Sequence, residues 1–523
     1  MFPEEFLERI ASQPYIDVGG LAAALQRPAE QSVRVNSRKW HDPVAGYERV
    51  PWEPDGYYLT EKVLFAPDPL FHAGAYYPQE SSGMFTGELF RQLTAGRSGL
   101  RVLDLCGAPG GKSTHLSSLI GDDGVLVANE VIASRAAVLA ENITKWGIGN
   151  TVVTQSDPSR FEALPGFFDV IVADAPCSGE GMFRSPVAVQ EWSLANARLC
   201  GERQRRIVME AWKALRPGGI FIYSTCTFNP AENEHNVSWL GESTGAETLA
   251  ADITGMDGIT EIRYRGVTGY GFHPGRVRGE GFFIAALRRP SQEGDDEIPT
   301  NERSRSGNRG FSSRNTGSVD RSFGSHNPGK SWSRSAGIRN TGSWEERIQG
   351  SRESRNTGGR YPGNNMSRNS RADGIPSAKA LETAATLTSF ERERLTVSNG
   401  RIIALAADAG LMSQISGSLN VIKYGTMIGE IKNGILIPAH DLAMSVRRIP
   451  GTVAEHDLSR DEALAFLRLD PMQPERMPEG RVLVRYRGVA LGFVNNLGSR
   501  VNNGYPRQWR LRMAVAPGYR EIL

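Results

Sequence analysis

Two cysteines stand in short motifs that could do covalent chemistry. Cys177 ends a DAPC motif, and Cys226 lies in an STCT motif. Each motif follows an apolar run, at 170–173 and at 220–223, that is typical of a buried strand. In an open α/β sheet, ligands bind at the carboxyl ends of the strands. We therefore expect the two thiols to meet at one edge of a sheet and to share the steps of a covalent reaction.

The other cysteines indicate neither a metal site nor a disulfide framework. The chain holds four cysteines, with no CxxC pair and none after Cys226. This pattern argues against zinc and leaves single thiols as candidate nucleophiles. A buried, inert thiol is the commoner fate of a lone cysteine, and we assign Cys106 and Cys200 to it.

The elements that must position these motifs alternate between strand and helix. Apolar runs typical of strands lie at 102–105, 125–130, 152–153, 170–172 and 220–223. Helical patterns separate them, one beginning at Lys112, one ending at Trp146 and a long one ending at Leu215. This alternation predicts an α/β fold, a doubly wound sheet covered by helices on both faces. We expect a turn at 217–219 and a late edge strand at 281–287.

A glycine-rich sequence, DLCGAPGGK, lies between the first strand and its helix. Glycines there let the backbone approach a ligand closely and leave free amides at a helix N-terminus. The sequence is neither a Walker loop nor a GxGxxG dinucleotide motif. We expect a cofactor to bind along this loop, at Cys106, Gly107, Ala108, Pro109, Gly110, Gly111 and Lys112.

Carboxylates follow the next strands, at Glu130, Asp157 and Asp174. An acid that ends the second strand of a doubly wound sheet is placed to accept hydrogen bonds from ribose hydroxyls. Each acid alone would be an ordinary loop carboxylate or helix cap. Three of them beside a glycine-rich turn resemble the class I S-adenosylmethionine methyltransferases, a Rossmann-like fold. On this resemblance Glu130 meets the ribose and Asp157 the adenine, and Asp174 meets either the methionine ammonium or the target base.

The paired cysteines suit one methyl transfer in particular. C5 of cytosine is a poor nucleophile until a thiolate adds at C6 and makes C5 enamine-like. After methylation a proton must leave C5 and the thiol must be eliminated. A second residue near the nucleophile would help this release.

The DAPCSG and STCT motifs are similar to the paired motifs of the Sun/nucleolar-protein type of RNA (cytosine-5) methyltransferases. The resemblance implies that Cys226 is the nucleophile and that Cys177 assists product release. It also implies that Asp174 contacts cofactor or base and that Lys112 lines the pocket. DNA cytosine-5 methyltransferases attack with the Pro-Cys thiol and lack the Thr-Cys motif. Further matching sequences are RVN at 34–36, YYPQESS at 76–82 and NPAENE at 229–234.

The SGEGMFR sequence at 178–184 and the YPR sequence at 505–507 resemble the bacterial RsmF-type branch of that family. The resemblance implies S-adenosylmethionine as cofactor, 16S rRNA or the small ribosomal subunit as partner, and a C-terminal PUA-like region. Two other classes stay open, a non-catalytic RNA-binding or ribosome-assembly factor and a tRNA or DNA cytosine-5 methyltransferase.

Composition and motifs together divide the chain into four parts. We expect an N-terminal RNA-contacting extension at 1–98 and a catalytic methyltransferase domain at 99–290, with a mostly parallel sheet and a late antiparallel strand. A disordered basic Arg/Ser/Asn/Gly linker follows at 291–376. The C-terminal RNA-binding region, α+β and PUA-like, occupies 377–523.

Particular side chains are candidates for RNA contacts in the two flanking regions. In the N-terminal extension we expect Arg34 and Lys39 to contact phosphates. Near the C-terminus, Tyr505 and Trp509 are interleaved with arginines, a pattern that combines stacking with charge.

The bulk composition is that of a globular protein and points to no membrane. Of 523 residues 39% are hydrophobic and 23% are charged, and the net charge is +2. No apolar run approaches the roughly 20 residues that span a bilayer. The first residues are acidic where a secretory signal would be basic, and we therefore expect a cytoplasmic protein.

The near-neutral total hides a basic stretch. From 303 to 371 the chain carries 14 Lys and Arg against 4 Asp and Glu, a local charge of +10. Such a segment either tracks an RNA backbone or acts as an extended linker only.

Deleting residues 303–371 distinguishes these two interpretations. If the segment contacts RNA, the deletion weakens RNA binding more at low salt than at high salt, because its contribution is counterion release. RNA titrations at two salt concentrations measure this difference. Equal affinity with and without the segment at low salt would leave only the linker interpretation.

Overall fold

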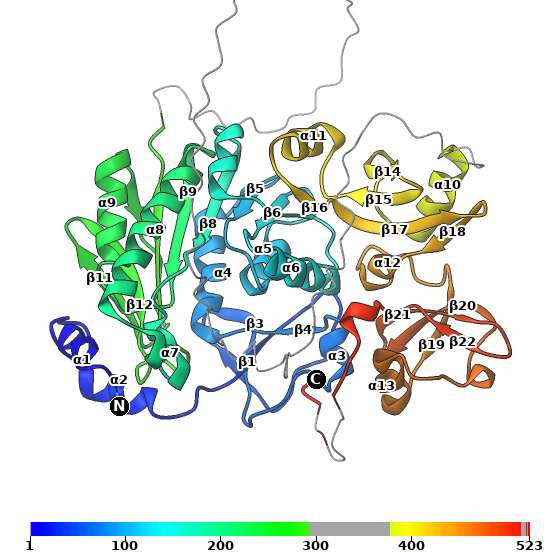
Figure 1. The fold of residues 1–523 in the computed structure, drawn as a ribbon, viewed down its shortest axis with the longest axis horizontal. Helices are drawn as coiled ribbons and strands as arrows, with labels where there is room; N and C mark the ends of the chain where they lie inside the picture. Colours follow the sequence, from blue (N-terminus) through cyan, green and yellow to red (C-terminus); the bar gives the residue numbers. More distant parts are fainter. Residues whose placement is uncertain (1, 292–376, 514–518, 520) are drawn as a thin grey trace, which may run out of the picture.

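The computed structural model describes residues 2–291, 377–513, 519 and 521–523 (Figure 1). The predicted linker at 291–376 lies, from residue 292 on, outside the described residues. Within the described part of the chain, no helix is long and apolar enough to cross a membrane.

Five parallel strands form the centre of the main sheet. They are β5 (Arg101–Asp104), β6 (Val125–Asn129), β7 (Thr151–Thr154), β8 (Phe168–Asp174) and β9 (Leu215–Thr225). Their order across the sheet is β9-β8-β5-β6-β7, and all four pairings are parallel. Their residues are almost all buried, as expected for parallel strands covered on both faces. The predicted α/β fold is confirmed, with parallel strands at the centre of a sheet that is mixed as a whole.

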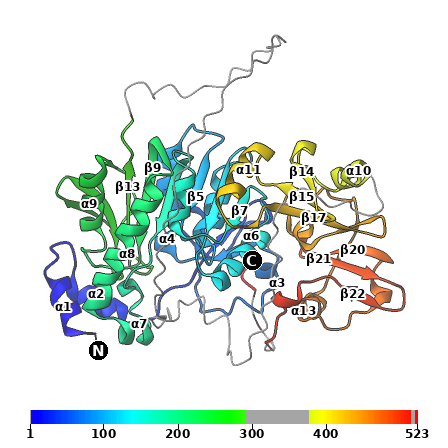
Figure 2. The same cartoon turned by 45° about the horizontal axis from the view of Figure 1, so that its top comes forward.

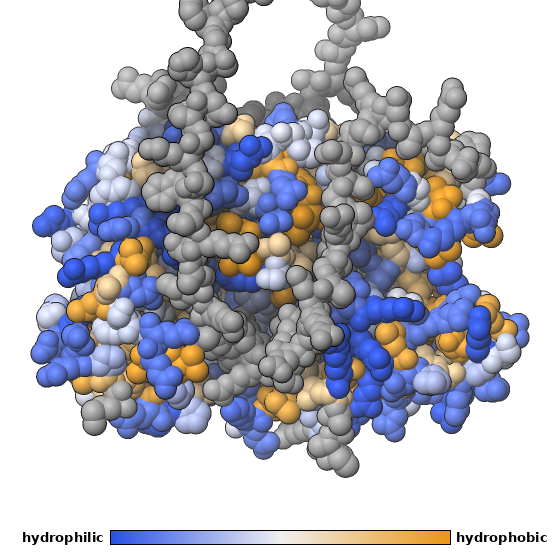
Figure 3. Space-filling view, in the orientation of Figure 1, coloured by the Kyte–Doolittle hydropathy of each residue, from blue (hydrophilic) through white to orange (hydrophobic). Residues whose placement is uncertain are grey.

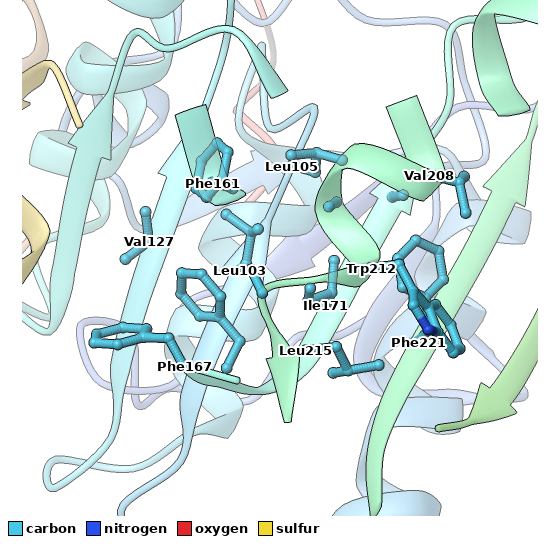
Figure 4. Close-up of a cluster of buried hydrophobic side chains, with 14 of the residues drawn as sticks. Leu103, Leu105, Val127, Phe161, Phe167, Ile171, Val208, Trp212, Leu215 and Phe221 are labelled. Atoms are coloured by element: carbon cyan, nitrogen blue, oxygen red, sulfur yellow. The ribbon is translucent and has the colours of Figure 1, made fainter. Parts of the chain in front are cut away.

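One face of the sheet is covered by α8 (Leu194–Trp212) and α9 (Glu234–Thr244). Figure 4 shows Leu103 and Ile171 of neighbouring strands in one buried cluster with Val208 and Trp212 of α8. Because successive strand residues point to opposite faces, these positions alternate with residues that face the other side.

The opposite face is covered by α4 (Ser81–Thr94), α5 (Gly111–Leu119) and α6 (Ala133–Trp146). Val102 and Ile222 of the sheet share a buried cluster there with Leu89, Leu116 and Leu139, one from each helix. The cofactor loop is thus held between a buried strand and a helix packed on the same sheet.

Antiparallel strands extend the sheet beyond β9. β13 (Phe282–Arg288) pairs with β9, and β12 (Val267–Phe272) and then β11 (Ile259–Tyr264) continue the sheet outward. The short strand β10 (Glu247–Leu249) also pairs with β13. The late strand was therefore predicted correctly, but its place at the edge was wrong. The outer strand β11 alternates buried and exposed residues and carries charges, so its apolar signal is weak.

Two local predictions on either side of β9 also differ from the structure. The long helix α8 ends at Trp212 rather than Leu215. The predicted turn at 217–219 lies inside β9 as a bulge, where the pairing with β8 jumps from Leu215 to Ile220. Gly218, with φ of +68°, lets the chain make this bend without leaving the strand.

The N-terminal region packs below the main sheet in Figure 1. Its elements are α1 (Glu4–Ala11), α2 (Val18–Leu25), α3 (Pro69–His72), β1 (Ser32–Val35), β2 (Glu48–Val50), β3 (Glu53–Tyr58) and β4 (Tyr76–Pro78). The four strands form an antiparallel sheet in the order β2-β3-β1-β4. Phe6 and Ile10 of α1 pack against Phe183 and Trp192, which flank the short helix α7 (Pro186–Glu191).

The C-terminal region contains two further four-stranded sheets. The first has the order β14 (Leu395–Ser398), β15 (Arg401–Leu405), β17 (Gly425–Lys432) and β18 (Ile435–Pro438). The second has the order β19 (Ala454–Asp457), β20 (Gly480–Tyr486), β21 (Val489–Asn496) and β22 (Val501–Asn503). The helices are α10 (Ser377–Leu387), α11 (Ala409–Ser418), α12 (His440–Met444) and α13 (Arg460–Arg468).

This region is packed against the rest of the molecule, and two of the contacts join its strands and its core to other parts. β16 (Val421–Lys423) adds an antiparallel edge strand to β7 of the main sheet and lies next to α11 in Figure 1, and Figure 2 shows α11 near β7. Farther along, Phe466 and Val484 share one buried cluster with Val33 and Tyr76 of the N-terminal sheet. The two ends of the chain therefore form one core.

Two of the expected RNA contacts are buried instead, and a third, Lys39, is half-buried with its ammonium bound inside the protein. Arg34 is 2% exposed; its Nε donates to Gln79 Oε1 at 2.8 Å and its guanidinium stacks on a tryptophan ring. The ammonium of Lys39 donates to two backbone carbonyls, one of them that of Ala73 at 2.9 Å. Tyr505 is 3% exposed. These expectations were wrong because the sequence does not show whether a basic or aromatic residue faces solvent or lies between two packed elements.

Replacing Arg34 by Gln tests its structural role. Its Nη2 also donates to Thr114 Oγ1 at 2.7 Å, so the change breaks charged hydrogen bonds in the interior. We expect the free energy of unfolding to fall by about 3 kcal/mol, measured by urea denaturation. The matched change Arg49→Gln, at an exposed position on β2, should have little effect. If Arg34→Gln left the free energy of unfolding unchanged but weakened RNA binding, the expectation that Arg34 contacts phosphate would be supported instead.

Candidate functional site

The site lies where the strand order of the main sheet reverses. The chain runs from β5 to β6 and β7 in one direction, and then returns to place β8 and β9 on the other side of β5. The loop after β5 and the end of β8 therefore meet at this switch point, where open α/β sheets bind their ligands.

Glycines shape the loop between β5 and α5. Gly110 has φ of +125°, and α5 begins there without a side-chain cap, so its first amides have no side-chain acceptor. A Cβ on Gly107 would lie 2.6 Å from Ser113 Oγ. Asn142 Nδ2 donates to the carbonyl of Pro109 at 2.8 Å. The loop is thus held in place with free amides at the start of the helix.

Asp104 is the first residue of the DLCGAPGGK sequence, and the motif alone predicted no role for its side chain. Its side chain is fully buried, and Oδ2 accepts from Ser113 Oγ at 2.6 Å. Oδ1 has no hydrogen-bond partner in the described part of the protein. Burial raises the pKa of this carboxyl to about 6. An unpartnered acceptor therefore lies beneath the loop.

The two acids after β6 and β7 have different environments. Glu130 is buried, and its Oε1 accepts from the amide of Ile132 at 3.0 Å. Asp157 is exposed, and its Oδ1 accepts from the amide and hydroxyl of Ser159, which lowers its pKa. Asp157 thus caps a short helical turn in this structure, whereas Glu130 lies beside the cofactor loop, where Arg135 reaches the carbonyl of Ala108.

Lys112 connects the cofactor loop to the DAPC segment. Its Nζ lies 2.8 Å from Asp174 Oδ2, and Ser224 Oγ donates to Asp174 Oδ1 at 2.8 Å. Burial alone would lower the pKa of Lys112, but the neighbouring carboxylate of Asp174 outweighs it and the pKa is raised. The lysine is therefore a fixed cation at the junction of β5, β8 and β9.

The two thiols meet, as the motifs predict. Cys177 Sγ lies 2.9 Å from Cys226 Sγ and accepts a hydrogen bond from the Cys226 amide at 3.2 Å. The hydrogen bond with Cys226, together with burial, raises the pKa of the Cys177 thiol well above its ordinary value. Cys177 therefore keeps its proton.

The remaining two thiols lie apart from this pair. Burial raises the pKa of Cys200, on α8, to about 11. Burial, with Asp104 nearby, also raises the pKa of Cys106. Among the described residues, no group of three or more His, Cys, Asp or Glu side chains is arranged to hold a metal ion.

Two acids beside the thiols had no assigned role in the sequence analysis. Glu180 and Glu232 are both fully buried, within two of the matching sequences. A fully buried acid is rare unless it is paired, but burial cannot be read from a sequence letter.

The strand order and the site at its switch point define a class I S-adenosylmethionine-dependent methyltransferase fold. Three family models match the chain: "16S rRNA methyltransferase RsmB/F" over 92–288, "N-terminal domain of 16S rRNA methyltransferase RsmF" over 2–81, and "Methyltransferase RsmF PUA domain" over 453–511. Together they span more than half of the sequence. Over these three segments the chain is similar to the RsmB/F family of 16S rRNA methyltransferases.

Curated relatives named "Ribosomal RNA small subunit methyltransferase F" are similar to this chain over somewhat more than half of its length. The protein from Enterobacter sp. (strain 638) is 37% identical over 309 residues, which cover 55% of this chain and 63% of that protein. The protein from Cronobacter sakazakii is 36% identical over 319 residues, covering 57% and 65%. The matched stretch thus spans less than two thirds of these relatives. A solved methyltransferase homologue from Pyrococcus horikoshii is 27% identical with a TM-score of 0.47, covering 55% of this chain and 95% of that chain.

Alkylation tests the described thiol environments. The raised pKa values of Cys177, Cys106 and Cys200 keep those thiols protonated at pH 7.5, so we expect iodoacetamide to label Cys226 first. Each cysteine lies in a different tryptic peptide, so mass spectrometry can follow all four separately. Faster labelling of any other cysteine would contradict the arrangement.

Proposed function

We propose that this protein transfers a methyl group from S-adenosylmethionine to C5 of cytosine in RNA, through a covalent adduct with Cys226. The observation that carries the proposal is the pair of thiols at 2.9 Å, placed at the ends of neighbouring strands beside the switch point. The family and the names of the relatives favour 16S rRNA or the small ribosomal subunit as substrate, in the cytoplasm.

The residues around the switch point fit the cofactor. The free amides at the start of α5 and the Gly107 and Gly110 positions suit a ligand that approaches the backbone closely. Glu130 offers a buried carboxylate for ribose hydroxyls. Asp157 is our candidate for a hydrogen bond to the adenine, made in addition to the bonds that its Oδ1 accepts from Ser159. When bound, S-adenosylmethionine supplies the electrophilic methyl group.

The chain's own residues would handle the base. Cys226 forms a bond from its sulfur to C6, and C5 becomes nucleophilic. After methylation water takes the C5 proton, the electrons of the C5–H bond restore the C5=C6 double bond, and the Cys226 sulfur leaves C6 as a thiolate. Cys177 keeps its proton and lies within hydrogen-bond reach of the Cys226 sulfur, so it can exchange a proton with that sulfur during release. Lys112 holds Asp174 at the boundary between cofactor and base.

Exposed basic residues near the C-terminus support RNA binding. Arg507, Arg510 and Arg512 are exposed around the buried Tyr505. Figure 3 shows strongly hydrophilic side chains where α13 and β21 lie in Figure 1. Charge on this surface can bind the phosphate backbone, while the tyrosine ring packs inside.

Two single changes test the assigned roles of the thiols. We expect Cys226→Ala to abolish both methyl incorporation and covalent RNA complexes, because no other group is placed to attack C6. We expect Cys177→Ala to accumulate a covalent protein–RNA adduct on denaturing gels, because release is impaired. The assays use radiolabelled S-adenosylmethionine with naked 16S rRNA and with unmodified small subunits.

Cys200→Ala is the matched control and should methylate at the wild-type rate. Normal turnover by Cys177→Ala without an adduct would exclude the release role. No incorporation by the wild-type protein into either substrate would favour the non-catalytic RNA-binding class. Activity on duplex DNA that depends on Cys177 and not on Cys226 would indicate a DNA enzyme.

A further inference from the structure

Two fully buried carboxylates lie behind the paired thiols, each in the segment that follows one of the cysteines. Glu180 comes three residues after Cys177, and Glu232 comes six residues after Cys226. Both side chains are 0% exposed. Burying an acid is costly unless its oxygens are hydrogen-bonded, so their partners show what they hold.

Glu232 holds the backbone around Cys177. Its Oε2 accepts from the amide of Ser178 at 2.9 Å and from Gln204 Nε2 at 3.0 Å. The same Gln204 nitrogen donates to the carbonyl of Pro176 at 3.0 Å. Glu232 and Gln204 therefore fix the backbone on both sides of Cys177 by hydrogen bonds.

Glu180 holds the backbone that follows Cys226. Its Oε2 accepts from the amide of Phe228 at 3.2 Å, and its Oε1 accepts from Trp192 Nε1 at 2.9 Å. Arg9 of α1 forms an ion pair with Glu180 at 2.6 Å and donates to the carbonyl of Phe228 at 3.2 Å. Both polar backbone groups of Phe228 are thereby fixed.

The two carboxylates cross over between the cysteine segments. Glu180 belongs to the Cys177 segment and binds the Cys226 segment, while Glu232 does the reverse. The Gly181 amide donates a further hydrogen bond to the Cys226 carbonyl at 2.9 Å. We call Glu180 and Glu232 the carboxylate clasp.

We propose that the carboxylate clasp positions the two thiols against one another, with Glu232 setting the place of Cys177 and Glu180 that of Cys226. Apolar side chains would fill the same space at lower desolvation cost, so the clasp is better explained by position than by stability. The consequences for catalysis rest on the proposed function. Loosening Glu232 should then impair release, and loosening Glu180 should impair attack.

An electrostatic role for Glu232 makes the opposite prediction. The pKa of Cys177 is raised by its hydrogen bond with Cys226, by burial and, further, by its electrostatic interaction with Glu232. Removing the carboxylate charge alone would make Cys177 easier to ionise and its thiol more reactive. If Glu232 instead fixes the position of Cys177, removing its hydrogen bonds would bring the two thiols into contact less often.

Diamide oxidation of the whole protein, without RNA, separates these roles. Diamide takes up the two electrons and two protons that the thiols lose on forming a disulfide, and becomes a hydrazine. Mass spectrometry of tryptic peptides follows the Cys177 to Cys226 link. We expect rapid linking in the wild type and about tenfold slower linking in Glu232→Gln and in Glu180→Gln. Both oxygens of each glutamate accept hydrogen bonds, and the second oxygen of Glu232 accepts from Asn229 Nδ2 at 3.3 Å. The NH2 group of each glutamine would therefore face a donor, and one hydrogen bond would be lost.

Glu234→Gln is the matched control, since Glu234 is buried in the same stretch but accepts from Tyr15 at 2.6 Å. It should link at the wild-type rate. Faster linking in Glu232→Gln would support the electrostatic role and overturn the proposal. Absence of the link in the wild-type protein would overturn it too, whether or not either variant folds.

An RNA arm tests the catalytic consequence. With 16S rRNA and S-adenosylmethionine, Glu232→Gln should accumulate the covalent adduct as Cys177→Ala does, whereas Glu180→Gln should form adduct about tenfold more slowly. Rapid turnover without adduct in Glu232→Gln, while Cys177→Ala traps it, overturns the positioning role alone. If the wild-type protein methylates nothing, the proposed function fails, and the diamide result still decides the clasp.

Discussion

The site depends on the register between two neighbouring parallel strands. Asp174 at the end of β8 lies opposite Ser224 at the end of β9, and their side chains are hydrogen-bonded. From this pair the chain needs only three residues to reach Cys177 and two to reach Cys226. A slip of one residue in either strand would turn its side chains to the other face and separate the thiols. The bulge before Ile220 shows that the register is adjusted lower in the sheet so that it is correct at this end.

Ion pairs that are at least partly shielded from water join the site to regions far away in the sequence. Lys112 and Asp174 join the cofactor loop to the DAPC segment, and Arg9 brings the first helix to Glu180. Charges in a protein interior are tolerated when each has a partner, so these pairs restrict the arrangements in which all three segments can pack. The N-terminal helix is thereby part of the frame around the thiols. Arg34 plays a similar role between the N-terminal sheet and α5.

The central strands were predictable because parallel strands buried on both faces are continuous apolar runs. The same physics explains the errors. β11 is partly exposed and its charged positions hide it, so β13 was placed at an edge. Arg34 and Tyr505 were assigned to RNA because residue type carries no information on burial. The contact between the C-terminal core around Phe466 and the N-terminal sheet joins parts of the chain that no local pattern relates.

The sequence by itself determined the order of strands and helices, the glycine-rich loop and the two cysteine motifs, because these depend on local apolar pattern and on short spacing. Only the tertiary structure decided which acids serve the thiols. Glu180 and Glu232 stand in sequence like any other glutamates, and their importance arises from packing that excludes water and brings backbone amides of the opposite segment to their oxygens. The distance between Cys177 and Cys226 is likewise a property of strand register and burial, which act between residues 49 positions apart.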